Sequence, residues 1–86
     1  MRPDIKRAID LYASEGHPVG DFLYAVLSNN LKNALGRADS DNERDIKEIV
    51  MYVYWEIPGD CWGSEKKVDD WLEKKCAERM AARSKV

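Results

Sequence analysis

The sequence predicts an all-α protein, a compact irregular bundle of four to five short helices. Apolar residues recur at intervals of three and four in several segments, which is the spacing of one helix face. No segment keeps the alternation of apolar and polar residues that is typical of a strand. The 86 residues allow one helical domain over 1–86. A chain of this length buries only about 60–65% of its unfolded surface, so its stability is modest.

The first helix is predicted to begin near Pro3, because proline suits a first helical turn. Gly16 supplies its end, and residues 17–20 form a connection. The apolar positions between these limits follow helical spacing and are Ile5, Ala8, Ile9 and Tyr12.

Two short helices are expected next. Asp21 is a candidate N-cap for the first, over 22–27, and Ser28 with the two asparagines that follow breaks the pattern. Apolar residues resume from Leu31 until Gly36. One kinked helix fits equally well, but we favour two helices, with Asn29 or Asn30 capping the second.

The most apolar helix follows a capping-box pattern, with Ser40 at the cap and Glu43 three residues later. It is apolar on most of its circumference, which favours a place in the centre of the bundle. Pro58 and Gly59 end it. Its main apolar positions are Ile46, Ile49, Val50, Val53, Tyr54 and Ile57, flanked by Met51, Tyr52 and Trp55.

The last helix is expected to be capped by Ser64 and to bury one face. That face comprises Val68, Trp71, Leu72, Cys76 and Met80. Residues 73–86 are a basic helix end, with five basic residues against two acidic ones, a local charge of +3. This end is interpreted as a solvated, fraying terminus; a contact surface for an anionic partner is the alternative.

Composition excludes several classes of function. The net charge of −2 comes from charges of mixed sign, so nucleic acid is not favoured as a partner. Two cysteines and one histidine make neither a disulfide framework nor a metal site. No apolar run approaches the roughly 20 residues of a membrane span, and the N-terminus does not resemble a signal peptide. We therefore expect a cytoplasmic protein with reduced thiols.

Catalysis is not expected. A nucleophilic pair would need His17 beside Cys61 or Cys76. Cys76 has core spacing, and nothing orients His17 towards Cys61, although a helix start near Cys61 could lower its thiol pKa. The acidic residues of 39–45 are explained by the preference of carboxylates for a helix N-terminus. No Gly-rich phosphate loop occurs, so we expect no enzyme, catalytic residue, metal or cofactor.

Several polar residues around the third predicted helix stand next to apolar positions. Caps and turns explain them, because their side chains replace lost backbone partners. Alternatively, they line a polar pocket with an aromatic wall, in which Arg37 would contact an anion. The candidate binding residues are Asn29, Asn30, Arg37, Asp39, Asn42, Trp55, Trp62 and Ser64.

The three tryptophans receive different interpretations. Trp71 has the spacing of a core residue, whereas Trp55 lies off the main apolar stripe and is expected to be partly exposed. Trp62 lies in the connection between the last two helices, where it is either a packed cap over the bundle or an anchor for an interface.

Residues 20–72 resemble a family of small phage and prophage proteins. The resemblance rests on the segments Gly20-Asp21-Phe22-Leu23-Tyr24-Ala25-Val26-Leu27-Ser28-Asn29-Asn30-Leu31, Arg37-Ala38-Asp39 with Asn42, and Ile57-Pro58 followed by Cys61-Trp62-Gly63-Ser64. Family members often carry Asp at position 30 and Asn at position 55, where this chain has Asn30 and Trp55.

The resemblance implies a phage product that acts by binding inside a bacterial cell, for example by blocking a defence complex or sequestering a nucleotide signal. The expected function is therefore a non-enzymatic binding protein that modulates a host process, with counter-defence as the leading hypothesis. Its partner would be a host protein complex or a small nucleotide. The alternatives are a nucleic-acid-binding module that uses the basic tail and a structural subunit that forms a homodimer.

Overall fold

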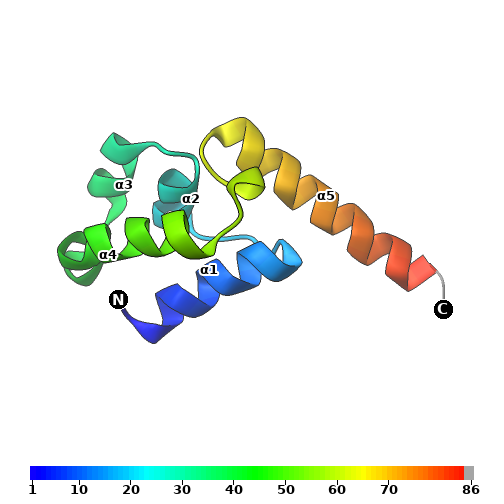
Figure 1. Cartoon of the computed structure of the whole chain (residues 1–86), viewed down its shortest axis with the longest axis horizontal. Coiled ribbons are helices and arrows are strands. Elements are labelled where there is room, and N and C mark those ends of the chain that lie inside the picture. The colour runs from blue at the N-terminus through cyan, green and yellow to red at the C-terminus, as the bar shows by residue number, and fades with distance from the viewer. Residues whose placement is uncertain (85–86) are drawn as a thin grey trace.

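The computed structural model describes residues 1–84, which form five α-helices and one short 3-10 helix and contain no strand (Figure 1). The all-α bundle predicted from the sequence is therefore confirmed. Fraying was predicted for residues 73–86; α5 is helical up to Ser84, and residues 85–86 lie outside the described residues. The elements are α1 (Pro3–Glu15), α2 (Asp21–Leu27), α3 (Leu31–Arg37), α4 (Ser40–Glu56), η1 (Gly59–Cys61) and α5 (Glu65–Ser84).

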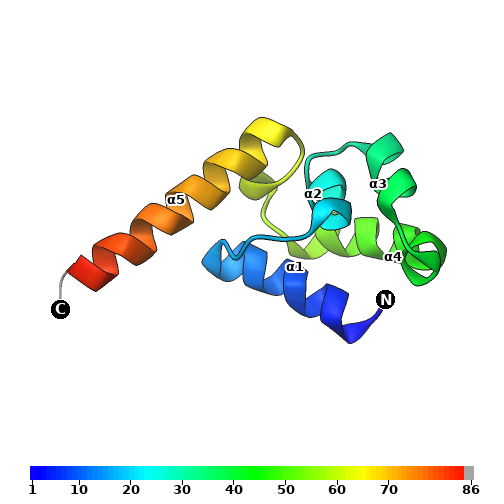
Figure 2. The same cartoon turned by 180° about the vertical axis from the view of Figure 1, so that it is seen from behind.

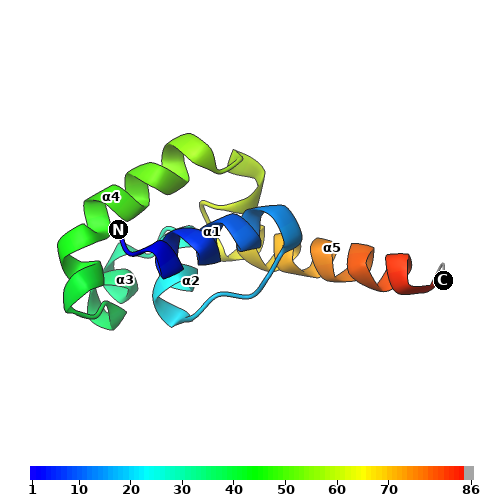
Figure 3. The ribbon, with the colours of Figure 1, turned by 90° about the horizontal axis from the view of Figure 1, so that it is seen from below.

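The first four helices form a compact body, from which α5 extends (Figures 1 and 2). α1 runs alongside α4, and the Tyr52 hydroxyl of α4 donates a hydrogen bond to Asp10 of α1 (Figure 3). The N-terminal part of α5 packs on this body, while its C-terminal part projects away. This projection gives the molecule its elongated dimensions of 45 × 25 × 22 Å.

The hydrophobic core receives residues from all five helices and is centred on α2, where five of seven residues are buried. The sequence predicted α4 as the central helix, and this prediction is wrong. Within α4 only Asn42, Ile49 and Val53 are buried. The core consists of Ile5, Ile9, Tyr12, Phe22, Leu23, Ala25, Val26, Leu27, Ala34, Ile49, Val53, Ile57, Cys61 and Val68.

Two helices end in a residue with left-handed backbone. α1 ends at Gly16, whose φ is 66°, as its predicted stop. α2 is followed by Asn29, whose φ is 62°. Asn29 donates its N–H to the Val26 carbonyl at 3.1 Å, and Asn30 donates to the Ala25 carbonyl at 2.8 Å. This pair of bonds is a Schellman motif, which satisfies carbonyls at the end of α2.

Two of the predicted N-caps are confirmed. Asn30 caps α3, because its Oδ1 accepts a hydrogen bond from the Asn33 N–H at 3.2 Å. Ser64 caps α5, since its Oγ accepts one from the Lys67 N–H at 3.1 Å. Local side-chain chemistry therefore fixes where these helices begin.

Two other caps were predicted one residue too late. α4 is capped by Asp39, not Ser40, and the Asp39 carboxylate accepts a hydrogen bond from the Asn42 N–H at 2.8 Å. α2 has Gly20 at its N-cap position, and Asp21 is the first residue of the helix. Aspartate suits both positions. As a cap it accepts a hydrogen bond from a backbone N–H, and in the first turn its negative charge interacts favourably with the positive end of the helix dipole.

The apolar face predicted for α5 is buried only at its beginning. Val68 is fully buried and Trp71 is half-buried, with its Nε1 donating to the Tyr12 carbonyl at 2.8 Å. Cys76 and Met80 are exposed, so the predicted core role of Cys76 is wrong. The reason is that α5 turns another side to the body of the protein: Trp71, Leu72 and Lys75 are half-buried, and Lys75 packs against Gly16, whereas residues 76–81 are exposed.

Candidate binding groove between α4 and the α2–α3 pair

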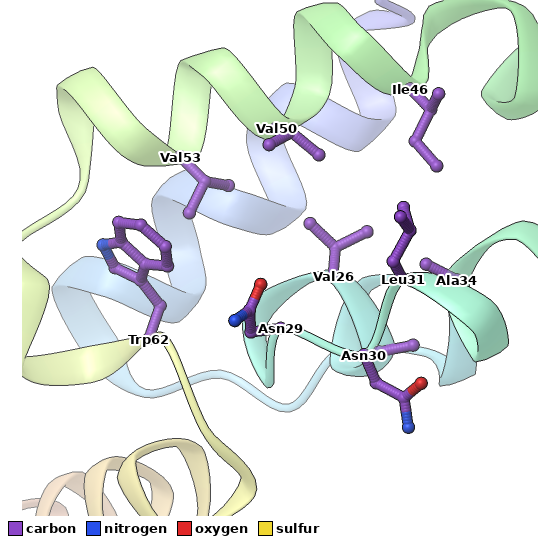
Figure 4. A pocket seen from close by; sticks show the side chains of 10 residues that line it. Val26, Asn29, Asn30, Leu31, Ala34, Ile46, Val50, Val53 and Trp62 are labelled. Atoms are coloured by element: carbon purple, nitrogen blue, oxygen red, sulfur yellow. The ribbon is translucent and has the colours of Figure 1, made fainter.

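A groove of about 230 Å³ lies between α4 on one side and α2 with α3 on the other, and Trp62 closes one end (Figure 4). We call it the apolar groove. Aliphatic side chains from all three helices form its floor and sides. Its lining residues are Ala25, Val26, Asn29, Asn30, Leu31, Ala34, Ile46, Val50, Val53 and Trp62.

The Trp62 wall is held in place by the connection between α4 and α5. Its indole Nε1 donates to the Ile57 carbonyl at 3.1 Å, so the ring's polar atom is satisfied away from the groove. The next residue, Gly63, donates its N–H to the Leu27 carbonyl at 2.7 Å and ties the connection to α2. The Trp62 ring also meets Tyr54 in an edge contact, with centroids 6.1 Å apart. Trp62 is therefore a fixed, half-buried cap that still presents ring surface to the groove.

Asn29 supplies the polar end of the groove. Its side chain turns towards the space between Trp62 and Val26, whereas that of Asn30 points away (Figure 4). Asn30 uses its carbonyl oxygen to cap α3. Among residues 1–81, whose side chains the structure describes, no hydrogen bond involves the Asn29 side-chain amide. The Schellman turn thus carries an amide with an unused donor and an unused acceptor at the groove.

The groove differs from the polar pocket that the sequence predicted. Three of the eight predicted residues line it: Asn29, Asn30 and Trp62. The other five residues, which the alternative of a common polar pocket included, do not line this groove. None of the lining residues is charged.

Arg37 lies outside the apolar groove. Its Nη1 is 3.2 Å from an Asp21 carboxylate oxygen, and both side chains are exposed. It contributes to a separate shallow hollow that also includes Asn30 and Glu65. An anion at this hollow would compete with Asp21 and would meet the Glu65 carboxylate. Arg37 is therefore an ion-pair partner of α2 in this structure.

Asp39, Asn42 and Ser64 have structural places. Asp39 and Ser64 cap α4 and α5. The Asn42 backbone N–H, and secondarily the Arg2 guanidinium, hold the pKa of Asp39 below its usual value. Asn42 is only 6% exposed, at the start of α4. These three residues lie at the beginnings of helices and do not form a binding surface.

Trp55 belongs to an exposed apolar surface that extends from the groove. We call it the α4 apolar face; its residues are Val50, Met51, Tyr54 and Trp55. Trp55 is 71% exposed and meets Tyr54 edge to face, with ring centroids 5.0 Å apart. Leu31 of α3, 63% exposed, stands across the groove. The sequence signal for this face was present, since these residues produced the apolar circumference that was interpreted as burial.

Cys61 is not an activated thiol. Cys61 is completely buried, and burial raises its thiol pKa, which is the reverse of what a reactive thiolate needs. Its Sγ lies 3.2 Å from the Pro58 carbonyl oxygen, and its own carbonyl accepts the Tyr12 hydroxyl. Cys61 is thus a packed residue in the connection between α4 and α5.

Residues 1–84 contain no group of three or more His, Cys, Asp or Glu side chains placed to hold a metal ion. None of the helices in the described part of the chain is both long and apolar enough to cross a membrane. Comparisons of the chain with protein-family models, with curated proteins and with solved structures found no match.

Proposed function

We propose that this chain is a non-enzymatic binding protein that captures a partner protein on its apolar groove and α4 apolar face. The observation that carries the proposal is the continuity of these two surfaces, because Val50 belongs to both and Tyr54 contacts the Trp62 wall. Contiguous exposed apolar surface is typical of protein interaction sites. Exposed aromatic residues such as Trp55 are the residues that most often dominate binding energy.

A protein partner is favoured over a nucleotide. The groove measures about 230 Å³, whereas pockets for small molecules usually measure about 300–1,000 Å³. Its lining offers no cation to a phosphate, and Arg37 is paired with Asp21 outside it. A partner's apolar side chain suits such a lining, because its burial releases water without leaving a charge unpaired.

The biological setting of the proposal comes from the resemblance to small phage and prophage proteins over residues 20–72. On that basis the partner is a protein complex of the bacterial host, and the chain modulates it as a phage counter-defence product. Blocking a complex requires only a surface and an affinity, and the exposed faces of α3 and α4 supply the surface.

Nucleic-acid binding through the basic end of α5 is less favoured. In the described part of this helix, Lys66 is 2.8 Å from Asp70, and Lys75 is 3.3 Å from Glu78. Cations paired along a helix with carboxylates produce little of the single-sign field that attracts phosphates.

The test is capture of the partner from phage-infected bacterial cells with the full chain as bait. A double variant, Met51→Ser with Trp55→Ser, changes only exposed positions and should leave the thermal melt within a few degrees of the original. We expect a specific host protein to be retained by the original chain and lost with the double variant. Lys66→Ala, on the exposed surface of α5, is the matched control and should retain it.

Two outcomes would overturn the proposal. One is a captured protein that binds the double variant as well as the original chain. The other is a dimer in sedimentation that dissociates in the double variant, with no host protein retained, because the face would then belong to a second copy of the chain.

A further inference from the structure

We infer that the apolar groove binds an extended peptide segment of the partner, with one aliphatic side chain between Trp62 and Leu31 and a backbone amide paired with Asn29. The inference deepens the proposed function and rests on it, since it names the part of a protein that the groove accepts. It also gives the Asn29 side-chain amide a partner, in addition to the place of the Asn29 backbone in the Schellman motif.

The size of the groove limits its occupant to side chains. An α-helix with its side chains is about 10–12 Å across, and a hollow of about 230 Å³ cannot enclose one. The same volume accommodates one leucine-sized side chain with the adjoining backbone. Val26, Val50 and the Trp62 ring would then surround the inserted side chain (Figure 4).

The charge of the groove requires a neutral occupant. No carboxylate, ammonium or guanidinium group belongs to its lining. A charged side chain placed there would lose its water without gaining an opposite charge, which is strongly unfavourable. An aliphatic side chain and an uncharged peptide unit match these surroundings.

The Asn29 amide provides the polar match. It offers one N–H donor group and one carbonyl acceptor, which are complementary to the C=O and N–H of a peptide unit. In a helical segment these backbone groups are already paired within the helix, whereas in an extended segment they are free. The unused Asn29 amide at the mouth of the groove therefore favours an extended segment (Figure 4).

N-acetyl-L-leucinamide tests the inference, since it carries one aliphatic side chain between two peptide groups. Titrated into the ¹⁵N-labelled full chain, it should shift the NMR signals of the Trp62 indole N–H and the Asn29 side-chain amide. Saturation is expected at millimolar concentration, in line with the small size of the compound. N-acetylglycinamide, which lacks the side chain, should produce no saturable shift.

The variant Asn29→Gly tests the contribution of the side-chain amide to binding without changing the fold. Glycine adopts φ of 62° without strain, so this variant keeps the turn and loses only the side chain. The dissociation constant of N-acetyl-L-leucinamide should increase about fivefold or more, as expected for loss of hydrogen bonding to a neutral group. Lys66→Ala should bind as the original chain does.

Unchanged affinity in Asn29→Gly would overturn the inference, as would shifts confined to Met51 and Trp55 or a titration that never saturates. These outcomes are distinct from failure of the proposed function. If the host protein is still captured and lost in the Met51 and Trp55 double variant, the binding function stands and only the peptide mode fails.

Discussion

The ends of α1 and α2 have the same left-handed backbone but opposite surroundings. Gly16, after α1, is buried beneath α5, and a Cβ atom built on it would lie 2.1 Å from the Cβ of Lys75. Asn29, after α2, is exposed and carries a full side chain towards the apolar groove. One conformation therefore serves close packing at the first position and leaves an exposed side chain at the second.

The same difference separates the two sides of the molecule. On the side of α1, α5 and the connection, polar groups are paired within the fold, as in the Trp71 bond to the Tyr12 carbonyl. On the side of α3 and α4, apolar side chains such as Leu31 and Trp55 remain exposed. Burial provides stability on the first side, while the second side carries exposed apolar surface of the kind on which the proposed function depends.

Gly16→Ala should have the largest effect on stability. Alanine is disfavoured in the left-handed region by roughly 1–2 kcal/mol. In addition, its methyl group would collide with Lys75 on α5, and forced overpacking adds roughly 1–3 kcal/mol. We expect urea denaturation to show a loss of about 2–4 kcal/mol in the free energy of unfolding.

Two control variants separate the causes of this loss. Gly16→Asn tolerates the left-handed backbone but keeps the collision, so a full-sized loss in this variant would assign the effect to α5 packing. At Gly20 a Cβ atom meets nothing within 4 Å, and Gly20→Ala should change the free energy of unfolding by less than about 1 kcal/mol. Equal losses of unfolding free energy in Gly16→Ala and Gly20→Ala would contradict the difference between a glycine packed against α5 and one with free space beside it.

Tyr12→Phe should have the next largest effect, because it removes the buried hydroxyl bond from α1 to the Cys61 carbonyl. The expected loss is about 1–2 kcal/mol at pH 7, since the carbonyl is left without this donor. Burial, and then Cys61, raises the pKa of Tyr12 above its usual value of 10.0.

The pH dependence follows from this pKa shift. Above pH 10 the unfolded chain releases the Tyr12 proton while the folded chain retains it, so stability decreases as pH rises. The free energy of unfolding, measured from pH 9 to 11.5, should therefore fall less steeply in Tyr12→Phe than in the original chain. Parallel slopes would show that Tyr12 ionises equally in both states.

Substitution of Asn29 should have the smallest effect on stability, in contrast to substitution of Gly16. The Asn29 side chain has no hydrogen-bond partner among residues 1–81, so the free energy of unfolding of Asn29→Gly should lie within about 0.5 kcal/mol of that of the original chain. Asn29→Ala should lose about 1 kcal/mol, because only the backbone conformation is penalised. A loss above about 2 kcal/mol in Asn29→Gly would show that this side chain supports the fold.

Helix limits could be predicted from the sequence because they depend on local chemistry. Gly16 ends a helix, and Asn30 and Ser64 begin helices, as expected. The side of α4 that the core covers could not be predicted, since it depends on where distant helices pack. The residues around Val50 and Trp55 show the apolar pattern of a buried helix, and only the fold reveals that they are exposed.

The candidate site was predicted in part for the same reason. Asn29, Asn30 and Trp62 lie close in sequence to helix ends that the core brings together, and they do line one groove. Arg37 was expected to meet an anion, but the packing of α2 beside α3 gives it Asp21 instead. Ion pairs and hydrogen bonds between distant segments thus occupy polar groups that the sequence alone would assign to a binding site.

The hydrogen bond from Gly63 to the Leu27 carbonyl couples the groove to the docking of α5. Trp62 belongs to the connection between α4 and α5. Local unfolding of α5 would therefore displace Trp62 and remove one wall of the groove. The rate of hydrogen exchange at the Gly63 amide would then measure the same local opening that disrupts the groove. Affinity for the proposed partner and protection of this amide from exchange should therefore rise and fall together, because the groove is complete only while the connection stays bound to α2.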